Sequence, residues 1–420
     1  MVRPPWGRRW IAASVCGAAL GAMLARAVPA ATAPASTGTV ASRAQRARGE
    51  LADASGHRLD GRGASIAIID TGIDPTHPAF ALAGRGSKVA AVLSAEACII
   101  DGEESPYTSE VSSDPACVVP VPPANVDAGH GGHGTMVGGV AVGDAYQLPD
   151  GTEVGGVALG ARLIVISTTA GLVGIDNAFA WILAHHAAPC GAGVPASECP
   201  PIKVVNCSWG ASTPVIAHLQ DALARAGVVT VWANGNTGGD GSTDHSNPDA
   251  TDDQTPGVIA VAAYDDHGTG TRDGELASTS SRGQASQPTT WPDVSAPGVN
   301  IISACRPYQA ICPAVETEPP RSGPGPNDVD TYFIGSGTSF AAPEVAGIVA
   351  MLFQADPAAS AGQIEDALKS TAYKFKFGVP YQALGPYTSS YDKGAGLVDA
   401  YAASLALGAR RLGGDPGAGR

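Results

Sequence analysis

The chain has 420 residues, of which 44% are hydrophobic, enough to build a substantial core. Its 54 glycines and 33 prolines predict many turns and long loops. The formal net charge is −14 at pH 7. Residues 1–30 hold four arginines and no acidic residue, so the rest carries 21 basic against 39 acidic residues, a net charge of −18. This balance argues against nucleic acid or an anionic membrane surface as the partner.

The N-terminus has the features of an export signal. Arg3, Arg8 and Arg9 form a positive region, residues 10–25 form an apolar one, and Ala30 closes a small-residue cleavage site. The arginine pair also resembles a twin-arginine signal. An uncleaved anchor is the alternative, but the apolar run is short for a membrane span. We therefore expect a signal peptide at residues 1–30 and a soluble, secreted product.

Short apolar runs alternate with helical patterns along the chain. Strands are predicted at residues 64–70, 88–94, 162–168, 203–209, 228–233, 258–264 and 300–304. Helices are predicted at 175–187 and 213–226, the second with Gly227 as its stop. This alternation predicts an α/β fold, a three-layer sandwich with a mainly parallel sheet flanked by helices on both faces. In such a sheet the ligand site lies at the carboxyl ends of the strands.

The segment Gly-Ser-Gly-Thr-Ser-Phe-Ala-Ala-Pro at residues 335–343 reads as a glycine-rich turn that opens an apolar helix. It places Ser339 in the first helical turn, where backbone N–H groups have no partner within the helix. A serine in that position can attack a carbonyl carbon while neighbouring N–H groups receive the developing oxyanion. Ser339 is therefore the candidate nucleophile, and a serine that only caps the helix is the alternative.

Two upstream motifs supply matching partners for such a serine. Asp70 ends the apolar strand, where an ionised carboxylate is costly unless it is paired. His133 opens a helix, and a histidine pKa near ~6.5 suits a base that later returns its proton. Asp74, a turn residue, is the weaker alternative for the carboxylate. A metal pair of His130 and His133 has no evident third ligand.

The order Asp70, His133, Ser339 is the order found in subtilisin, and it differs from those of chymotrypsin and the α/β-hydrolases. On these motifs, residues 60–405 resemble the subtilisin-like serine proteases, the subtilases of peptidase family S8. The resemblance implies a secreted endopeptidase that hydrolyses peptide bonds through an acyl-enzyme, with these residues as its triad. A scaffold that keeps the fold and binds peptides without catalysis is the rival hypothesis.

Further site residues follow from the same resemblance. Asn236 matches the family's oxyanion-hole asparagine, and Asn234 is its competitor. Trp209 stands where leucine is common in the family. We expect a polypeptide substrate, a monomer, no nucleic acid and no stable membrane association. The implied substrate-binding residues form two short segments: Ser208, Trp209 and Gly210, and Ala233, Asn234 and Gly235.

The resemblance also sets the expected domain limits. The catalytic domain is predicted at residues 56–408, after a linker or short pro-segment at 31–55 and before a disordered tail at 409–420. The segment between the signal and the Asp70 strand is shorter than the family's usual folding prodomain. Glu344 and Met136 stand at positions where the family often has histidine.

Seven cysteines remain after the signal peptide. Proximity favours the disulfides Cys98–Cys117, Cys190–Cys199 and Cys305–Cys312, although six cysteines allow about 15 connectivities. Cys207 is left over within an apolar strand, where a buried free thiol is expected. The cysteine spacing gives no zinc signal, and the chemistry requires no cofactor. Many family members bind calcium. One acidic loop is a candidate calcium site, although it lacks EF-hand spacing, and a solvated loop without a metal is the alternative. Its acidic residues are Asp240, Asp244, Asp249, Asp252 and Asp253.

Overall fold

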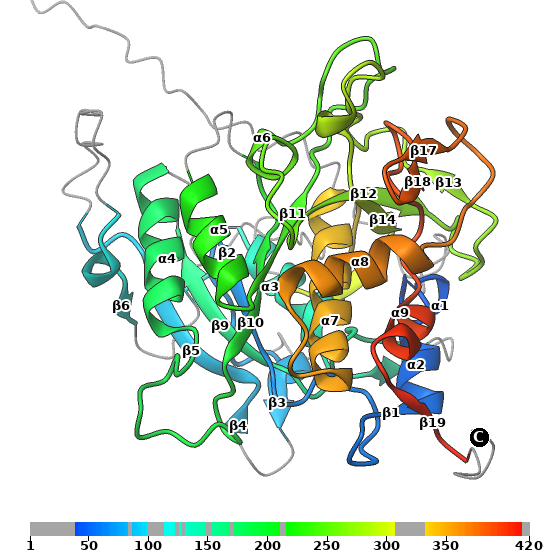
Figure 1. Cartoon of the computed structure of the whole chain (residues 1–420). Helices are drawn as coiled ribbons and strands as arrows, with labels where there is room; N and C mark the ends of the chain where they lie inside the picture. Colours follow the sequence, from blue (N-terminus) through cyan, green and yellow to red (C-terminus); the bar gives the residue numbers. More distant parts are fainter. Residues whose placement is uncertain are drawn as a thin grey trace, which may run out of the picture.

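The computed structural model describes residues 38–82, 86–98, 113–121, 126–127, 131–147, 153–168, 172–210, 216–306 and 332–413. The predicted signal peptide, His130 and Cys312 lie outside these residues. In the part that is described, helices cover both sides of a central sheet (Figure 1).

The central sheet has nine strands in the described part of the chain, in the order β13-β12-β11-β10-β2-β9-β5-β6, with β14 beside β12. The strands from β5 across to β12 and β14 are parallel, and β6 and β13 pair antiparallel at the two edges. All six residues of β2 are buried, as expected for a parallel strand covered on both faces. The strands are β2 Ser65–Asp70, β5 Val89–Ser94, β6 Val119–Pro120, β9 Arg162–Ser167, β10 Ile202–Cys207, β11 Val229–Ala233, β12 Val258–Asp265, β13 Glu275–Leu276 and β14 Val294–Pro297.

Helices on the two faces complete the three layers. The described helices are α1 Gly38–Ala41, α2 Ala44–Glu50, α3 His133–Val142, α4 Leu172–His185, α5 Ala217–Arg225, α6 Pro248–Thr251, α7 Thr338–Ala355, α8 Ala361–Thr371 and α9 Ala400–Ala406. Ala67 and Ile69 of β2 belong to the core cluster formed with α4 and α5. Ile66 and Ile68 belong to the cluster formed with α3 and α7. Because strand side chains alternate between the faces, β2 serves both cores, and the predicted three-layer α/β fold is confirmed.

Shorter pairs of strands decorate this sandwich. They are β3 Ala81–Leu82 with β4 Gly86–Ser87, β7 Tyr146–Gln147 with β8 Glu153–Val154, β15 Ile301–Ala304 with β16 Tyr332–Gly335, and β17 Gln382–Leu384 with β18 Tyr387–Ser389. The predicted strand at 300–304 is therefore present but belongs to a separate antiparallel pair. The strand predicted at 203–209 ends at Cys207, so Ser208 and Trp209 follow it. Gly227 follows α5 with φ +76°, the left-handed conformation of a helix stop.

The N-terminal segment packs on the domain and differs from the expected linker. Helices α1 and α2 bury small apolar residues, Ala41, Ala44 and Ala47. Ser42 donates a hydrogen bond to buried Glu344 at 2.6 Å. Strand β1, Leu51–Ala52, pairs with β19, Arg410–Arg411, so order also extends into the predicted tail. Alanine-rich composition hides this packing from sequence reasoning, because alanine buries little area per residue.

Cysteines follow the predicted pattern where they are described. The disulfides Cys98–Cys117 and Cys190–Cys199 are confirmed. Cys305 is also disulfide-bonded, but the predicted partner lies outside the described residues, so that pairing stays a prediction. Cys207 is free and buried in β10, as expected.

Helix α7 is the long central helix of the domain. Its length and hydropathy meet the requirements of a membrane span, but it is wholly buried inside the protein. It packs against α3 and against β10, β11 and β12. This position makes α7 the rigid support of the residues at its N-terminal end, which include Ser339.

Candidate active site

Asp70 and His133 form a buried pair at the carboxyl end of the sheet. Nδ1 of His133 lies 2.8 Å and 3.0 Å from the two carboxylate oxygens of Asp70. Asp70 is the last residue of β2 and His133 the first of α3, so both side chains start from the ends of rigid elements. Opposite a carboxylate, Nδ1 carries the proton and donates it, which leaves Nε2 as the acceptor of the ring.

A glycine allows α3 to approach β2 this closely. A Cβ atom on Gly134 would lie 2.1 Å from the carbonyl oxygen of Gly72, well inside any tolerable contact. The glycine that follows His133 is therefore required by the backbone of the loop after Asp70. This close approach brings the imidazole within hydrogen-bonding distance of the carboxylate.

Burial and nearby charges shift the pKa of His133 in opposite directions. The residue is 6% exposed. Desolvation lowers the pKa of the imidazole, but the charge and hydrogen bond of Asp70, with a smaller effect of the Asp127 charge, outweigh it and raise the pKa above its ordinary value. Protonated His133 is thus stabilised by its surroundings. The pair suits a base that must hold a proton during a reaction step.

Ser339 lies in the first turn of α7, as the sequence predicts. Two residues before it stands Gly337, whose φ of 152° and ψ of 166° are open to glycine alone. The ring of Phe340, the next residue, has its centroid 6.2 Å from that of His133, so the helix start lies against the histidine. The residue after Ser339 thus contacts His133, which in turn contacts Asp70, while the hydroxyl of Ser339 forms its hydrogen bond elsewhere.

The hydroxyl of Ser339 donates a hydrogen bond to the carbonyl oxygen of Ser208 at 2.8 Å. In return, the hydroxyl of Ser208 donates to the carbonyl oxygen of Ser339 at 2.9 Å. That carbonyl has no helical partner, because Pro343 lacks the N–H that would serve it. Among the residues that the structure describes, Nε2 of His133 has no hydrogen-bond partner. The acceptor position of the ring is therefore not used by a described residue.

Asn236 is fixed beside the candidate nucleophile by its amide oxygen. That oxygen accepts hydrogen bonds from the backbone N–H of Thr338 at 2.9 Å and from its hydroxyl at 3.1 Å. A backbone N–H can only donate, so the contact settles the orientation of the amide and leaves Nδ2 as a donor. The competitor Asn234 is fully buried, and its Nδ2 donates to the carbonyl oxygen of Ser281 at 2.9 Å.

Residues 61–399 match the model of the Subtilase family, Peptidase S8. The chain belongs to the Subtilase family. The match covers the whole sheet and the positions of Asp70, His133, Asn236 and Ser339.

Several named relatives support the assignment. Serine protease AprX of Bacillus subtilis (strain 168) is 29% identical over 339 residues, which cover 77% of this chain and 64% of the relative. Fervidolysin of Fervidobacterium pennivorans is 32% identical over 324 residues, or 74% of this chain and 37% of the relative. The chain thus spans less than two thirds of the length of these relatives.

A solved structure shows the same fold. The crystal structure of fervidolysin, described as a keratinolytic enzyme related to subtilisin, aligns with a TM-score of 0.54 at 28% identity. The alignment covers 83% of this chain and 43% of that one. The subtilisin-like fold predicted from the sequence is confirmed.

The two predicted substrate-binding segments of this subtilase follow neighbouring parallel strands. Ser208 follows β10, and Ala233 ends β11, which pairs with β10. The side-chain amide of Asn247 donates to the carbonyl oxygens of Trp209 at 3.2 Å and Ala233 at 2.9 Å. Asn247 therefore joins the two segments. Sequence reasoning missed it, because a loop asparagine gives no signal of such a bridge.

Trp209 is a half-buried residue whose side chain packs against neighbouring elements. Its indole N–H donates to the carbonyl oxygen of Ile69 at 2.8 Å, and its ring meets that of Trp232 edge to face at 4.8 Å. The indole thus ties the segment after β10 to the strand that ends in Asp70. Gly210, next along the chain, is exposed.

Asp74, the weaker candidate for the carboxylate, has a different partner. Its side chain is fully buried and forms an ion pair with Nε of Arg306 at 3.1 Å. Its oxygen also accepts from the N–H and hydroxyl of Thr76. Asp74 therefore stabilises the loop after β2, and Asp70 is the carboxylate that contacts His133.

The acidic loop shows no metal geometry in the residues described. Asp240 accepts from the N–H and hydroxyl of Ser242, and Asp244 does the same for Ser246. These are local turn contacts. No group of three or more His, Cys, Asp or Glu side chains in the described ranges is placed to hold a metal ion.

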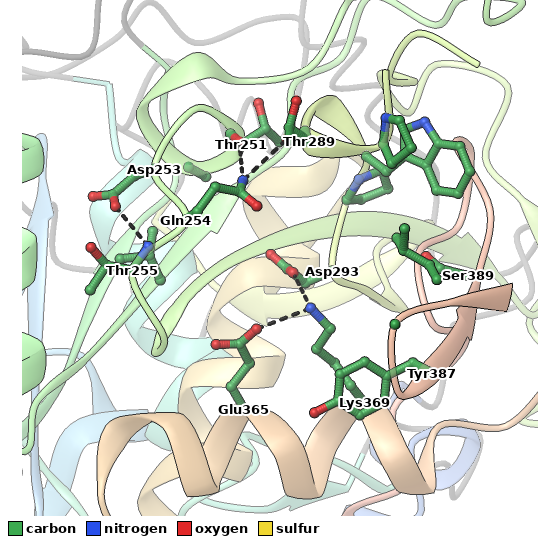
Figure 2. Close-up of a pocket in the computed structure, with 17 residues that line it drawn as sticks. Thr251, Asp253, Gln254, Thr255, Thr289, Asp293, Glu365, Lys369, Tyr387 and Ser389 are labelled. Atoms are coloured by element: carbon green, nitrogen blue, oxygen red, sulfur yellow. Dashed lines mark hydrogen bonds and ion pairs between the residues drawn. The ribbon is translucent and has the colours of Figure 1, made fainter. Parts of the chain in front are cut away.

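A separate cavity of about 310 Å³ lies between α6, α8 and the β17–β18 hairpin (Figure 2). An ionic cluster forms part of its wall: Nζ of Lys369 lies 2.8 Å from Asp293 and 3.0 Å from Glu365. The remaining carboxylate oxygens accept from the N–H groups of Ala260 and Gly257. Each carboxylate oxygen thus has a partner within the protein, which indicates a structural role.

Proposed function

We propose that this subtilase is a serine endopeptidase that hydrolyses peptide bonds through an acyl-enzyme. The observation that carries the proposal is the 2.8 Å contact between Asp70 and Nδ1 of His133, with Ser339 at the adjacent start of α7. Family membership supports the same chemistry. Polypeptides are the proposed substrates.

The reaction begins when the hydroxyl of Ser339 turns from the carbonyl of Ser208 toward Nε2 of His133. Nε2 takes the proton as Oγ attacks the scissile carbonyl carbon, and Asp70 stabilises the imidazolium. Nε2 then gives the proton to the leaving amine, and an acyl-enzyme on Oγ remains. Water repeats the sequence, giving its proton to Nε2 and releasing the acid.

The oxyanion of each tetrahedral intermediate needs donors that are already oriented. Nδ2 of Asn236 and the backbone N–H of Ser339 are the proposed donors. The hydrogen bond from the N–H of Thr338 to the amide oxygen of Asn236 supports this role, because it fixes the orientation of Nδ2 before the reaction begins. No cofactor is required for these steps.

Two segments are proposed to bind the substrate backbone: Ser208, Trp209 and Gly210, and Ala233, Asn234 and Gly235. Their position at the carboxyl ends of β10 and β11 supports this role. The side chain of Asn234 supports the loop through Ser281, so its backbone is the part offered to substrate. We infer a monomer that acts without nucleic acid or stable membrane association.

Export from the cell is part of the proposal. The arginine-containing apolar N-terminus and the two disulfides favour a secreted enzyme, since disulfides persist in oxidising compartments. A calcium ion on the acidic loop stays a prediction. Calcium titration followed by thermal unfolding would test it.

Labelling of the purified chain by a fluorophosphonate probe tests the chemistry. We expect the wild type to be labelled and both Ser339→Ala and His133→Ala to lose labelling. Cleavage of an unfolded protein substrate should be lost in the same variants. A folded wild type that is not labelled would favour the rival hypothesis, a scaffold that binds peptides without catalysis.

A further inference from the structure

A second buried carboxylate, that of Asp127, lies behind the Asp70–His133 pair. Its side chain is fully buried. It accepts hydrogen bonds from the backbone N–H groups of Gly132 at 3.1 Å and Thr135 at 2.8 Å, at the start of α3. It also accepts from the hydroxyls of Thr71 at 2.6 Å and Thr135 at 2.5 Å. Thr71 directly follows Asp70, so Asp127 joins the end of β2 to the start of α3.

Backbone contacts fix the direction of both hydroxyl protons. The hydroxyl oxygen of Thr71 accepts from the N–H of Gly134 at 2.9 Å, and that of Thr135 accepts from the N–H of Asp74 at 2.9 Å. Each hydroxyl has one proton to donate, and the nearest acceptor in both cases is Asp127. The contact of the Thr71 hydroxyl with Asp70 is longer, at 3.3 Å. Four donors thus converge on Asp127, which suits an ionised carboxylate.

This cluster surrounds His133 in the chain. Gly132 precedes the histidine, and Gly134 and Thr135 follow it, and each of the three contacts Asp127 directly or through Thr71. The backbone on both sides of the imidazole is therefore held by one carboxylate. The same carboxylate accepts from the hydroxyl of Thr71, the residue next to Asp70.

We propose that Asp127 is a positioning residue for His133, which fixes the imidazole against Asp70 by holding Thr71 and the first turn of α3. The inference deepens the proposed function and rests on it. Asp127 touches neither the proposed nucleophile nor the oxyanion donors. It acts through the backbone of the histidine and through its own charge.

The charge of Asp127 gives the proposal a distinctive signature. Burial, with a smaller effect of the Asp70 charge, raises the pKa of Asp127 itself, and the hydrogen bonds from Thr135 and Thr71 oppose that shift. The negative charges that raise the pKa of His133 come from Asp70 and Asp127. The backbone N–H of Asp74 donates to the hydroxyl of Thr135 in the same helix turn, and the carboxylate of Asp74 is paired with Arg306. Loss of the Asp127 charge should therefore lower the pKa of His133.

The test measures the rate of fluorophosphonate labelling against pH in the full-length chain. Asp127→Asn should move the midpoint of the profile to lower pH and reduce the plateau rate by about 10- to 100-fold, because small displacements of a catalytic group carry costs of that size. Thr71→Val, which removes the hydroxyl but keeps the shape, should reduce the plateau. Thr71→Ser, which restores the hydroxyl, should recover most of it.

Thr76→Val is the matched control. Thr76 lies in the same loop and donates to Asp74 rather than to Asp127. This variant should keep the wild-type midpoint and plateau. Rates are expressed per folded molecule, with thermal unfolding as the check. Should Asp127→Asn fail to fold, the Thr71 pair still decides the proposal.

The proposal is overturned if folded Thr71→Val and Asp127→Asn retain the wild-type midpoint and plateau, since a purely structural role would lower only the melting temperature. NMR titration of the His133 imidazole in the Ser339→Ala background reads the same shift without catalysis. A wild type that is never labelled would therefore defeat the proposed function, while the NMR midpoint in Asp127→Asn would still decide this inference.

Discussion

The carbonyl oxygen of Ser339 accepts its hydrogen bond from the hydroxyl of Ser208, at 2.9 Å, instead of from a helical N–H. Pro343 is the reason, because a proline four residues on has no proton to donate. Nδ2 of Asn206 in turn donates to the Ser208 hydroxyl at 2.9 Å. A side chain that follows β10 therefore completes the first turn of α7 at the proposed nucleophile.

Ser208→Ala should lower both stability and turnover. It leaves the buried carbonyl of Ser339 and the amide of Asn206 without their partner, which costs about 1–3 kcal/mol of unfolding free energy. We expect kcat to fall with less effect on KM, because the turn that carries Ser339 loses its anchor. Urea unfolding and steady-state kinetics on a peptide substrate measure the two effects.

Two further variants make this prediction specific. Ser404→Ala also removes a fully buried hydroxyl, but one that has no hydrogen-bond partner in the part of the chain that the structure describes, so stability should not fall. Pro343→Ala in the Ser208→Ala background supplies the missing N–H and should recover part of the loss. Equal destabilisation by Ser208→Ala and Ser404→Ala would contradict the role assigned to the Ser208 hydroxyl.

Asn236→Ala should lower kcat strongly and leave KM nearly unchanged. A donor aimed at the oxyanion acts only in the transition state, and its loss costs about 10²- to 10³-fold, the scale known for subtilisin, a member of the same family. Steady-state kinetics on a peptide substrate provides the measurement. If the variant keeps more than a third of the wild-type kcat, the assignment of Asn236 to the oxyanion hole is wrong.

Asn234→Ala is the matched comparison for Asn236. Its amide donates to the carbonyl of Ser281 within the loop, so its loss should lower the unfolding free energy by about 1 kcal/mol. Turnover per folded molecule should stay close to wild type. If turnover is lost only in Asn234→Ala, then Asn234 is the oxyanion-hole residue and Asn236 is the one that supports the loop.

The sequence predicts the ends of elements at the site well, because local signals determine them. The predicted strand at 64–70 is observed at Ser65–Asp70, and the predicted helix starts fall at His133 and Thr338. An aspartate after an apolar run, and glycines before a helix, are signals carried by neighbouring residues. Order along the chain then identified the family.

What the sequence could not reveal depends on contacts between distant segments. Ser42 and Glu344 are 302 residues apart, and their hydrogen bond turns an apparent linker into part of the domain. Burial raises the pKa of Glu344 to about 7, an effect no local pattern records. Asp127 was missed for the same reason, since its partners come from two elements and its own neighbours form no motif.

Lys369→Met should destabilise the protein away from the proposed active site. The ammonium group links Asp293 and Glu365 at the wall of the cavity (Figure 2), and its removal leaves two carboxylates with like charge close together. Losing one partner of a largely buried ion cluster costs about 3 kcal/mol. Calorimetry should show a larger loss at pH 8 than at pH 5, because burial and the Asp293 charge raise the pKa of Glu365 and favour its neutral form in acid.

Lys376→Met provides the control for that measurement. Lys376 is exposed in the same C-terminal region, and its replacement should change stability by less than about 0.5 kcal/mol. Labelling of Ser339 should be unaffected in folded Lys369→Met, since the triad residues do not line the cavity. If the stability of Lys369→Met is unchanged, the structural role assigned to the ionic cluster is contradicted.

Asp176→Asn should stabilise the protein at alkaline pH. Asp176 lies in α4, is 3% exposed, and has a buried carboxylate oxygen for which the described residues supply no hydrogen-bond partner. Burial raises the pKa of this carboxyl from 3.8 to about 6. Between those two values the folded state binds the proton and the unfolded state does not, so stability falls as pH rises through this interval and stays reduced above it.

Asparagine has nearly the shape of the protonated acid but cannot ionise, so the variant should escape this loss. We expect a gain of about 1–3 kcal/mol at pH 8 and little difference from wild type at pH 4, from urea unfolding at both values. Asp221→Asn, at an exposed side chain of α5 that pairs with Arg225 at the surface, should show no such dependence. A difference between Asp176→Asn and wild type that does not change with pH would mean that the pKa of this carboxyl is the same in the folded and the unfolded chain, and it would defeat the prediction.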